Sequence, residues 1–168
     1  STSSLRCPVA RYNKYSLTLS YLQPFRLWNE NFSFDSLATG QRSEDVLFSP
    51  QRISLGGLNS VRGFQDQTLS GNSGGYWRNQ LRWRRAVTWP ALQPFVQEYG
   101  MAFAYDVGVI KGDRYNHDAR GRMSGNALEL NARGQYLAAS VSFARSLERP
   151  AIIERREHPV YFRVDLFF

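Results

Sequence analysis

Polar and apolar residues alternate with a period of two along most of this chain. Tyr15, Leu17 and Leu19 share one face of their segment, for example, whereas Ser16 and Thr18 occupy the other. This pattern is typical of a β-strand with one apolar face, and no segment shows a helical period. The sequence predicts an all-β antiparallel fold, a single domain over residues 1–168. It has eight strands, at residues 12–22, 27–36, 49–57, 76–83, 95–110, 127–133, 136–144 and 159–168.

The two faces of these strands indicate a membrane protein. Several segments are about ten residues long, which is the length that a tilted strand needs to cross a bilayer. Their apolar faces carry aromatic residues toward the strand ends, and the opposite faces carry charges in mid-strand. In outer-membrane barrels, aromatic girdles at the membrane interfaces account for the first feature, and a water-filled lumen accounts for the second. We therefore expect a transmembrane β-barrel in the outer membrane of a Gram-negative bacterium, in contact with outer-membrane lipid and lipopolysaccharide. A soluble lipocalin-like barrel, apolar inside, is the alternative.

Composition excludes several other classes of function. The formal charge of +7 raises nucleic acid as a partner, but the arginines are scattered, so we expect no nucleic acid. The one cysteine, Cys7, excludes an internal disulfide and a cysteine-based zinc site. No run of eighteen apolar residues predicts a membrane helix, and residues 1–15 contain no apolar core of a signal peptide. We expect neither a cofactor nor a metal.

A glycine-rich loop at about residues 57–75 has Arg62 near its centre. Judged by these residues alone, Arg62 is more typical of a solvated loop. A groove for the loop is nevertheless predicted on a neighbouring strand, where Asp106 lies on the polar face. The residues that share this face with Asp106 are all small: Gly100, Ala102, Ala104 and Gly108.

Four motifs together resemble a known family. They are SLGGLNSVRGF (residues 54–64), GYWRNQLRW (residues 75–83), YDVG (residues 105–108) and a last strand ending in VDLFF (residues 164–168). From Tyr12 onward the chain is similar to the TpsB family of two-partner secretion transporters, the hemolysin-activator type of ShlB, FhaC and CdiB. The resemblance implies a barrel of sixteen strands, of which this chain matches strands nine to sixteen. The POTRA domains and the plug helix of the family are expected to be absent from the chain.

The resemblance also implies the partners. Members of the family export a large TpsA-type protein, such as a β-helical hemolysin, adhesin or contact-dependent-inhibition effector. Because an eight-stranded barrel is just filled by its own side chains, this chain alone is expected to be a non-conducting fragment. Self-association of the half-barrel, or pairing with another chain, would complete a pore. An outer-membrane insertase of the same superfamily, and a small structural or adhesive barrel, are the alternatives.

The resemblance further implies that the loop folds back into the lumen and contacts the inner wall. Arg62 would then pair with Asp106, because a guanidinium and a carboxylate can bind each other through two hydrogen bonds. The residues expected at this contact are Val61, Arg62, Gly63 and Phe64 of the loop, with Tyr105, Asp106 and Gly108 of the wall.

Two further sets of residues follow from the predicted barrel. Lumen-facing charges are expected to pair across the lumen, or to form a polar track for an unfolded substrate: Arg52, Arg78, Arg82, Glu98, Glu129, Arg163 and Asp165. The last strand resembles the signal that the barrel-assembly machinery recognises, with Phe162, Val164, Leu166 and Phe168 facing outward.

We do not expect an enzyme. His117 and His158 each stand beside an acidic residue, Asp118 and Glu157 respectively. Adjacent residues in a loop seldom face each other, so these pairs do not form the base and orienting group that a nucleophile needs.

Overall fold

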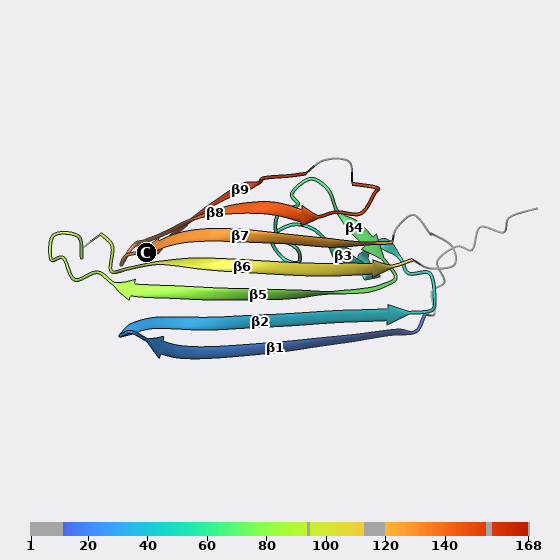
Figure 1. The fold of residues 1–168 in the computed structure, drawn as a ribbon, viewed down its shortest axis with the longest axis horizontal. Helices are drawn as coiled ribbons and strands as arrows, with labels where there is room; N and C mark the ends of the chain where they lie inside the picture. The colour runs from blue at the N-terminus through green and yellow to red at the C-terminus, as the bar shows by residue number, and fades with distance from the viewer. Residues whose placement is uncertain (1–11, 94, 113–119, 154–155, 168) are drawn as a thin grey trace, which may run out of the picture.

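In the computed structural model, which describes residues 12–93, 95–112, 120–153 and 156–167, the chain forms one large antiparallel sheet and a separate short pair of strands (Figure 1). In spatial order the large sheet consists of β1 (Lys14–Leu27), β2 (Glu30–Ser43), β5 (Ser73–Ala86), β6 (Glu98–Lys111), β7 (Gly121–Arg133), β8 (Leu137–Glu148) and β9 (Val160–Leu166). A 3₁₀ turn, η1 (Ser49–Gln51), precedes β3 (Ile53–Leu55), which pairs only with β4 (Leu69–Gly71). We call the segment between β2 and β5, residues 44–72, the VRGF loop.

The all-β antiparallel architecture is confirmed, but the prediction of eight strands in one sheet is wrong for one of them, residues 49–57. Of residues 49–57 only Ile53–Leu55 are extended, and they pair with β4 inside the VRGF loop. Ile53 and Leu55 alternate as in a wall strand because both are buried against the inner wall. The sheet therefore has seven strands, with β1 and β9 at its edges within the described residues. Two of them, β1 and β2, precede Val61, instead of the three that were expected.

The first hairpin is also longer than expected. β1 continues through Pro24 to Leu27, and the turn consists of Trp28 and Asn29, whose φ angles are 51° and 61°. Two consecutive residues with positive φ are typical of the turn type that matches the twist of a hairpin. Trp28, which lies within the strand expected at residues 27–36, is 85% exposed in this turn.

Large apolar side chains cover the face of the sheet opposite the VRGF loop, which we call the outer face. The most exposed of those on the central and C-terminal strands are Trp77, Phe103, Phe143, Phe162, Val164 and Leu166. An apolar surface of this extent marks contact with lipid or with a partner. No helix among the described residues is long and apolar enough to span a membrane.

The hydrophobic core lies on the other side of the sheet, the inner face, between β6–β7 and the VRGF loop. Its buried members are Ile53, Leu55, Val61, Phe64, Leu69, Ile110, Met123 and Ile153, with Tyr76 packed beside them. Five of these come from the loop, so the loop supplies most of the core.

Candidate functional site

The VRGF loop leaves and re-enters the sheet at one point. The Ser73 hydroxyl accepts a hydrogen bond from the Ser43 amide at 2.9 Å and donates one to the Ser43 carbonyl at 3.0 Å. Because β2 and β5 are paired neighbours, the loop can fold over the sheet without separating any strands. The loop begins at residue 44, earlier than the expected start at residue 57.

Three glycines shape the tip of the loop. Gly56, Gly57 and Gly63 have φ angles of 114°, 85° and 103°, which side-chain-bearing residues rarely adopt. The Gly57 amide donates to the Phe64 carbonyl at 2.6 Å, which closes the tip. Ser60 reinforces the turn, since its hydroxyl accepts from the Gly56 amide and donates to the Gly56 carbonyl. The tip is thus a compact turn with Arg62 beside its closing bond.

The Arg62 side chain pairs with Asp106 through two hydrogen bonds. Its Nε lies 2.6 Å from Oδ2 of Asp106, and its Nη2 lies 2.8 Å from Oδ1. The backbone amide of Arg62 donates a third bond, 3.0 Å long, to Oδ2. Arg62 is 6% exposed and Asp106 is fully buried, so the pair is largely removed from water. A bidentate pair with an added backbone bond fixes both the position and the orientation of the loop tip.

Two residues of β5 complete the surroundings of this pair. Nη1 of Arg62 donates to Oε1 of Gln80 at 2.7 Å, and Gln80 is itself buried. Arg78, expected as a lumen-facing charge, donates from Nη1 to the Asn59 carbonyl at 3.1 Å, and its Nε lies 3.9 Å from Oδ1 of Asp106. Arg78 therefore connects the wall to the loop tip. The sequence placed Gln80 on the polar face but gave no reason to assign it to the site.

The wall beneath the loop tip is made of small residues, as the row around Asp106 predicted. Gly100, Ala102, Ala104 and Gly108 are all buried on the same face as Asp106. A side chain at Gly108 would meet Leu55 at 2.8 Å and Val61 at 3.0 Å. Gly125, which the sequence analysis missed, is the register partner of Asp106 on β7, and a Cβ there would collide with the Arg62 carbonyl. Gly108 and Gly125 leave room for the loop only because they lack side chains.

Val61 and Phe64 flank Arg62 and are fully buried in the core between loop and wall. Gly63 lies against β8, where an added Cβ would come within 2.6 Å of the Arg145 carbonyl. Tyr105, by contrast, was wrongly assigned to the contact. It is 39% exposed on the outer face, because neighbouring residues of a strand point to opposite sides.

Glu157, in the connection from β8 to β9, provides a second attachment point that the sequence analysis did not find. Its Oε2 accepts hydrogen bonds from the backbone amides of Gln65 and Asp66, immediately after the VRGF motif. Ser146 of β8 holds the Glu157 backbone, since its Oγ accepts from the Glu157 amide at 3.0 Å. The connection has no periodicity, so only the acidic side chain beside His158 marked the position. His117 and Asp118 lie outside the described residues.

Among the residues that the structure describes, the remaining predicted charges form no pair across a lumen. Arg82 pairs with Asp35 on the neighbouring β2 at 3.4 Å, and Arg163 pairs with Asp165 on its own strand at 2.8 Å. Glu98 of β6 pairs with Arg84 of β5 at 3.9 Å, and Glu129 lies on the inner face of β7 opposite Ala102 and Ser142. Arg52 is not on the wall. It follows η1, and its Nε donates to the Leu47 carbonyl at 3.1 Å.

The C-terminal strand β9 carries its apolar residues on the outer face, as expected. Phe162, Val164 and Leu166 are 79%, 64% and 62% exposed. The expectation for Phe168 falls outside the described residues. Within the described part of the chain, β9 is therefore the edge strand on this side of the sheet, and its outer face is apolar and exposed.

Comparison with known proteins identifies the family. The family model of haemolysin secretion/activation proteins ShlB/FhaC/HecB matches residues 1–132. The chain belongs to this family. It is 32% identical over 163 residues to the outer membrane transporter CdiB of Escherichia coli O6:K15:H31 (strain 536 / UPEC), covering 96% of this chain and 26% of that protein. It is 31% identical over 131 residues to the hemolysin transporter protein HpmB of Proteus mirabilis, covering 78% of this chain and 22% of that protein.

Two solved structures share the fold of this chain. CdiB from Escherichia coli superimposes with a TM-score of 0.82 at 30% identity, over 94% of this chain and 28% of that chain. CdiB from Acinetobacter baumannii gives a TM-score of 0.78 at 24% identity, over 94% and 27%. The chain thus spans about a quarter of the length of the relatives that it matches.

Proposed function

We propose that this chain forms part of the outer-membrane pore of a two-partner secretion transporter and has no enzymatic activity. The transporter would export a TpsA-type partner, a large β-helical hemolysin, adhesin or contact-dependent-inhibition effector. Family membership and relatives named outer membrane transporters support this proposal. The outer face supports a position in the lipid of a Gram-negative outer membrane, because its large side chains are apolar and exposed. Insertion by the barrel-assembly machinery through the β9 strand is part of the proposal.

In this proposal the Arg62–Asp106 pair holds the VRGF loop against the wall, and secretion requires that hold. The observation that carries it is the buried, three-bond contact between the loop tip and Asp106. Removing one partner of such a pair leaves a buried charge without its counter-ion, which costs about 3–5 kcal/mol. A change of this size is enough to move the loop from a docked to an undocked state.

The pore itself requires more than this chain. The seven-stranded sheet ends in two edges, β1 and β9, and the chain corresponds to about a quarter of its relatives. We infer that further strands of a longer protein, or of another copy of the half-barrel, pair with these edges. Alone, the chain would not conduct.

The proposal is tested by secretion of the cognate partner from cells that carry the full-length transporter. The variants are Arg62→Ala, Asp106→Ala, the double variant, and the exchange Arg62→Asp with Asp106→Arg. Each single variant is expected to lower secretion at least tenfold, the double variant to be no worse, and the exchange to recover part of the activity. Arg62→Lys keeps the charge but loses the two-bond geometry, so it is expected to fall between wild type and Arg62→Ala.

Barrel level in the outer membrane is measured alongside, so that loss of assembly is distinguished from loss of transport. Normal secretion by both single variants at normal barrel level would rule out the role of the pair. An absence of secretion by the wild-type transporter with any TpsA-type partner would rule out the transport function itself.

A further inference from the structure

A shallow apolar groove crosses the outer face near the ends of four strands. Leu17, Gly40, Gly75 and Val109 form one row in register across β1, β2, β5 and β6. The two middle positions have no side chain, so the floor of the groove is backbone between Leu17 and Val109. A Cβ at Gly40 would meet nothing within 4 Å, which shows that the space above it is open.

The groove continues toward the middle of the sheet along a second row. This row consists of Leu19, Ala38, Trp77 and Val107, in the same register as the first. Together the two rows line a groove of about 370 Å³ whose side chains are almost all apolar. From the strand ends inward, a hydrocarbon chain lying in the groove would pass the first row and then the second, and would therefore lie along the surface of the sheet.

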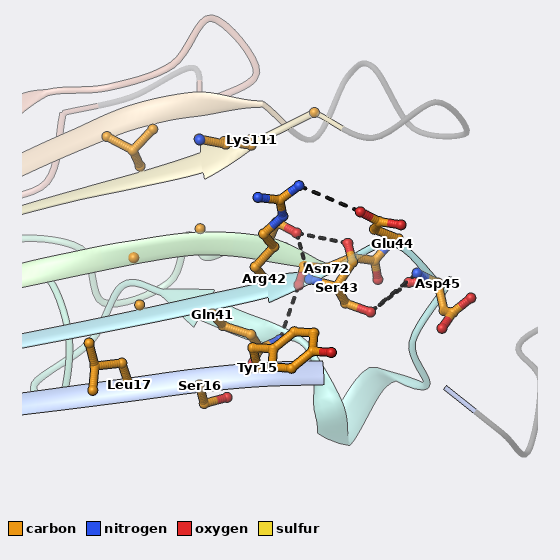
Figure 2. A pocket seen from close by; sticks show the side chains of 16 residues that line it. Tyr15, Ser16, Leu17, Gln41, Arg42, Ser43, Glu44, Asp45, Asn72 and Lys111 are labelled. Carbon is orange, nitrogen blue, oxygen red and sulfur yellow. Dashed lines mark hydrogen bonds and ion pairs between the residues drawn. The ribbon is translucent and has the colours of Figure 1, made fainter. Parts of the chain in front are cut away.

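Two cations stand where this groove opens at the strand ends. Arg42 of β2 and Lys111 of β6 are in the next row outward, and both line the larger pocket of Figure 2. Ser73 of β5 lies between their strands, opposite Lys111. Because the two strands are separated by one other strand, the backbones are about 10 Å apart, and both long side chains can reach a group between them.

Within the described part of the chain, neither cation has a strong internal partner. Arg42 pairs with Glu44 at 3.5 Å, but both side chains are highly exposed, at 78% and 87%. Such a surface pair contributes little and is easily exchanged for another anion. Lys111 makes no ion pair or hydrogen bond with any residue that the structure describes. Tyr15, on the same row as Arg42, adds an exposed aromatic ring to the rim.

The lengths of the connections assign this end of the strands to one side of the membrane. The side of Arg42 and Lys111 has the longest connection, residues 44–72, together with 112–120 and 149–159. On the opposite side two of the three connections, 28–29 and 134–136, are tight turns, and the third, 87–97, is of the same length as 149–159. Outer-membrane barrels have long loops outside and short turns in the periplasm. The groove therefore opens toward the outer leaflet, whose lipid is lipopolysaccharide.

We propose that this groove is a binding site for the lipid A part of lipopolysaccharide. An acyl chain lies over Gly40 and Gly75, and a phosphate group binds between Arg42 and Lys111. The apolar floor gains from burial of the chain, and the cations form charge-assisted hydrogen bonds with the phosphate. Basic residues at the border of an apolar membrane surface are the expected partners of anionic lipid head groups. This inference rests on the outer-membrane location proposed above.

The test uses the purified full-length transporter, stripped of lipid in detergent and titrated with bisphosphorylated lipid A while native mass spectrometry records the bound fraction. Arg42→Ala with Lys111→Ala is expected to weaken binding at least tenfold. Gly40→Leu, which fills the groove, is expected to weaken it by a similar factor. Arg85→Ala is the matched control, because Arg85 is near the opposite end of β5 and pairs with Glu30, and its binding should equal that of wild type.

Other ligands separate the sources of the anion. Lipid A without phosphates should bind the wild type at least tenfold more weakly than bisphosphorylated lipid A does. The double cation variant should bind the two forms of lipid A equally. Inorganic phosphate and phosphatidylglycerol should compete poorly at the same concentration. Equal binding of phosphatidylglycerol, or lipid A binding unchanged in both the cation and the groove variants, would overturn the proposal.

Failure of the inference can be told apart from failure of the proposed function. The cation and groove variants should secrete the partner at wild-type level, since they are remote from Arg62. Normal secretion and outer-membrane location without lipid A binding by the wild type would remove only the lipid site. Absence of the wild type from the outer membrane would remove the proposed function and, with it, the basis of this site.

Discussion

The VRGF loop and the β1–β2 hairpin differ in what holds them in place and in how their apolar side chains are covered. The hairpin is fully regular, yet its apolar residues are in the open, with Tyr15, Leu17 and Leu19 each at least 60% exposed. The loop contains little regular structure, yet Leu55 and Phe64 are completely buried. The hairpin is held by its ladder of backbone bonds and depends on lipid or further strands to cover it. The loop is held by side chains and depends on the wall.

This contrast predicts where substitutions act. A change under the loop should release the loop and leave the ladder intact, whereas a change in an exposed charge of the wall should do little to either. In the predictions below, amide hydrogen exchange of residues 57–64 in the full-length transporter reports on the loop, and exchange of β6 reports on the ladder.

The largest effect is expected for Phe64→Ala. Phe64 is fully buried in the core, and removing a buried phenylalanine costs about 3–5 kcal/mol from lost burial and the cavity left behind. The free energy of loop opening should fall by that amount, and exchange of the loop amides should rise more than a hundredfold. Phe103→Ala on the outer face is the control, because Phe103 is 53% exposed and does not contact the loop core. Equal exchange in the two variants would contradict the assignment of the core to the loop.

Gly125→Ala should come next. The added Cβ would collide with the Arg62 carbonyl, and since this is a backbone atom the loop must shift away from the wall. Overpacking of this kind costs about 1–3 kcal/mol. We expect faster exchange in the loop and reduced secretion of the partner. Gly40→Ala, where the new methyl group meets nothing within 4 Å, should match wild type in both measurements.

Glu157→Ala should have a smaller effect. It removes the acceptor of the Gln65 and Asp66 amides, but these positions are exposed and water can replace the carboxylate. The net contribution of such bonds is about 1 kcal/mol, so loop exchange should rise about fivefold. Glu148→Ala, which breaks a pair with Arg122 away from the loop, provides the comparison. An effect as large as that of Phe64→Ala would mean that Glu157 is a principal anchor.

The smallest effect is expected for Arg82→Ala. Arg82 shares a strand and a face with Arg78, but it is half-exposed and pairs with Asp35 of β2 instead of with the loop. Surface pairs contribute about 0–1 kcal/mol, so loop exchange and secretion should change less than twofold. A loss of secretion without a change in loop exchange would revive the polar track that was the alternative role of these charges.

The period of two correctly predicted the face of the sheet on which each side chain lies, because that depends on a single strand. It placed Asp106 with small neighbours on the inner face, and the apolar residues of β9 on the outer face, because side-chain direction alternates whatever the strand pairs with. The pairing of Arg62 with Asp106 came from the family resemblance. Alternation alone did not predict this pair, because the sequence around a loop arginine does not indicate which residue it will contact.

The errors arise where alternation has two explanations. Ile53 and Leu55 alternate like a lipid-facing strand but are buried by the inner wall, and Arg52 was misplaced with them. Tyr105 was assigned to the contact through its motif, although its parity is opposite to that of Asp106. Gln80, Gly125 and Glu157 could not be found, since their roles depend on which segments pack together across the sheet.

The adjacent ends of the VRGF loop at Ser43 and Ser73 have a consequence for the bore of the proposed pore. The backbone ladder between β2 and β5 ends at Gln41 and Gly74, and no loop residue pairs within it. The loop carbonyls of Gln51 and Asn72 accept hydrogen bonds from the side chain of Gln41. The circumference of the wall is therefore independent of the position of the loop, while the free cross-section inside it is not. The opening of the proposed pore could therefore change from narrow to wide without any change in its wall.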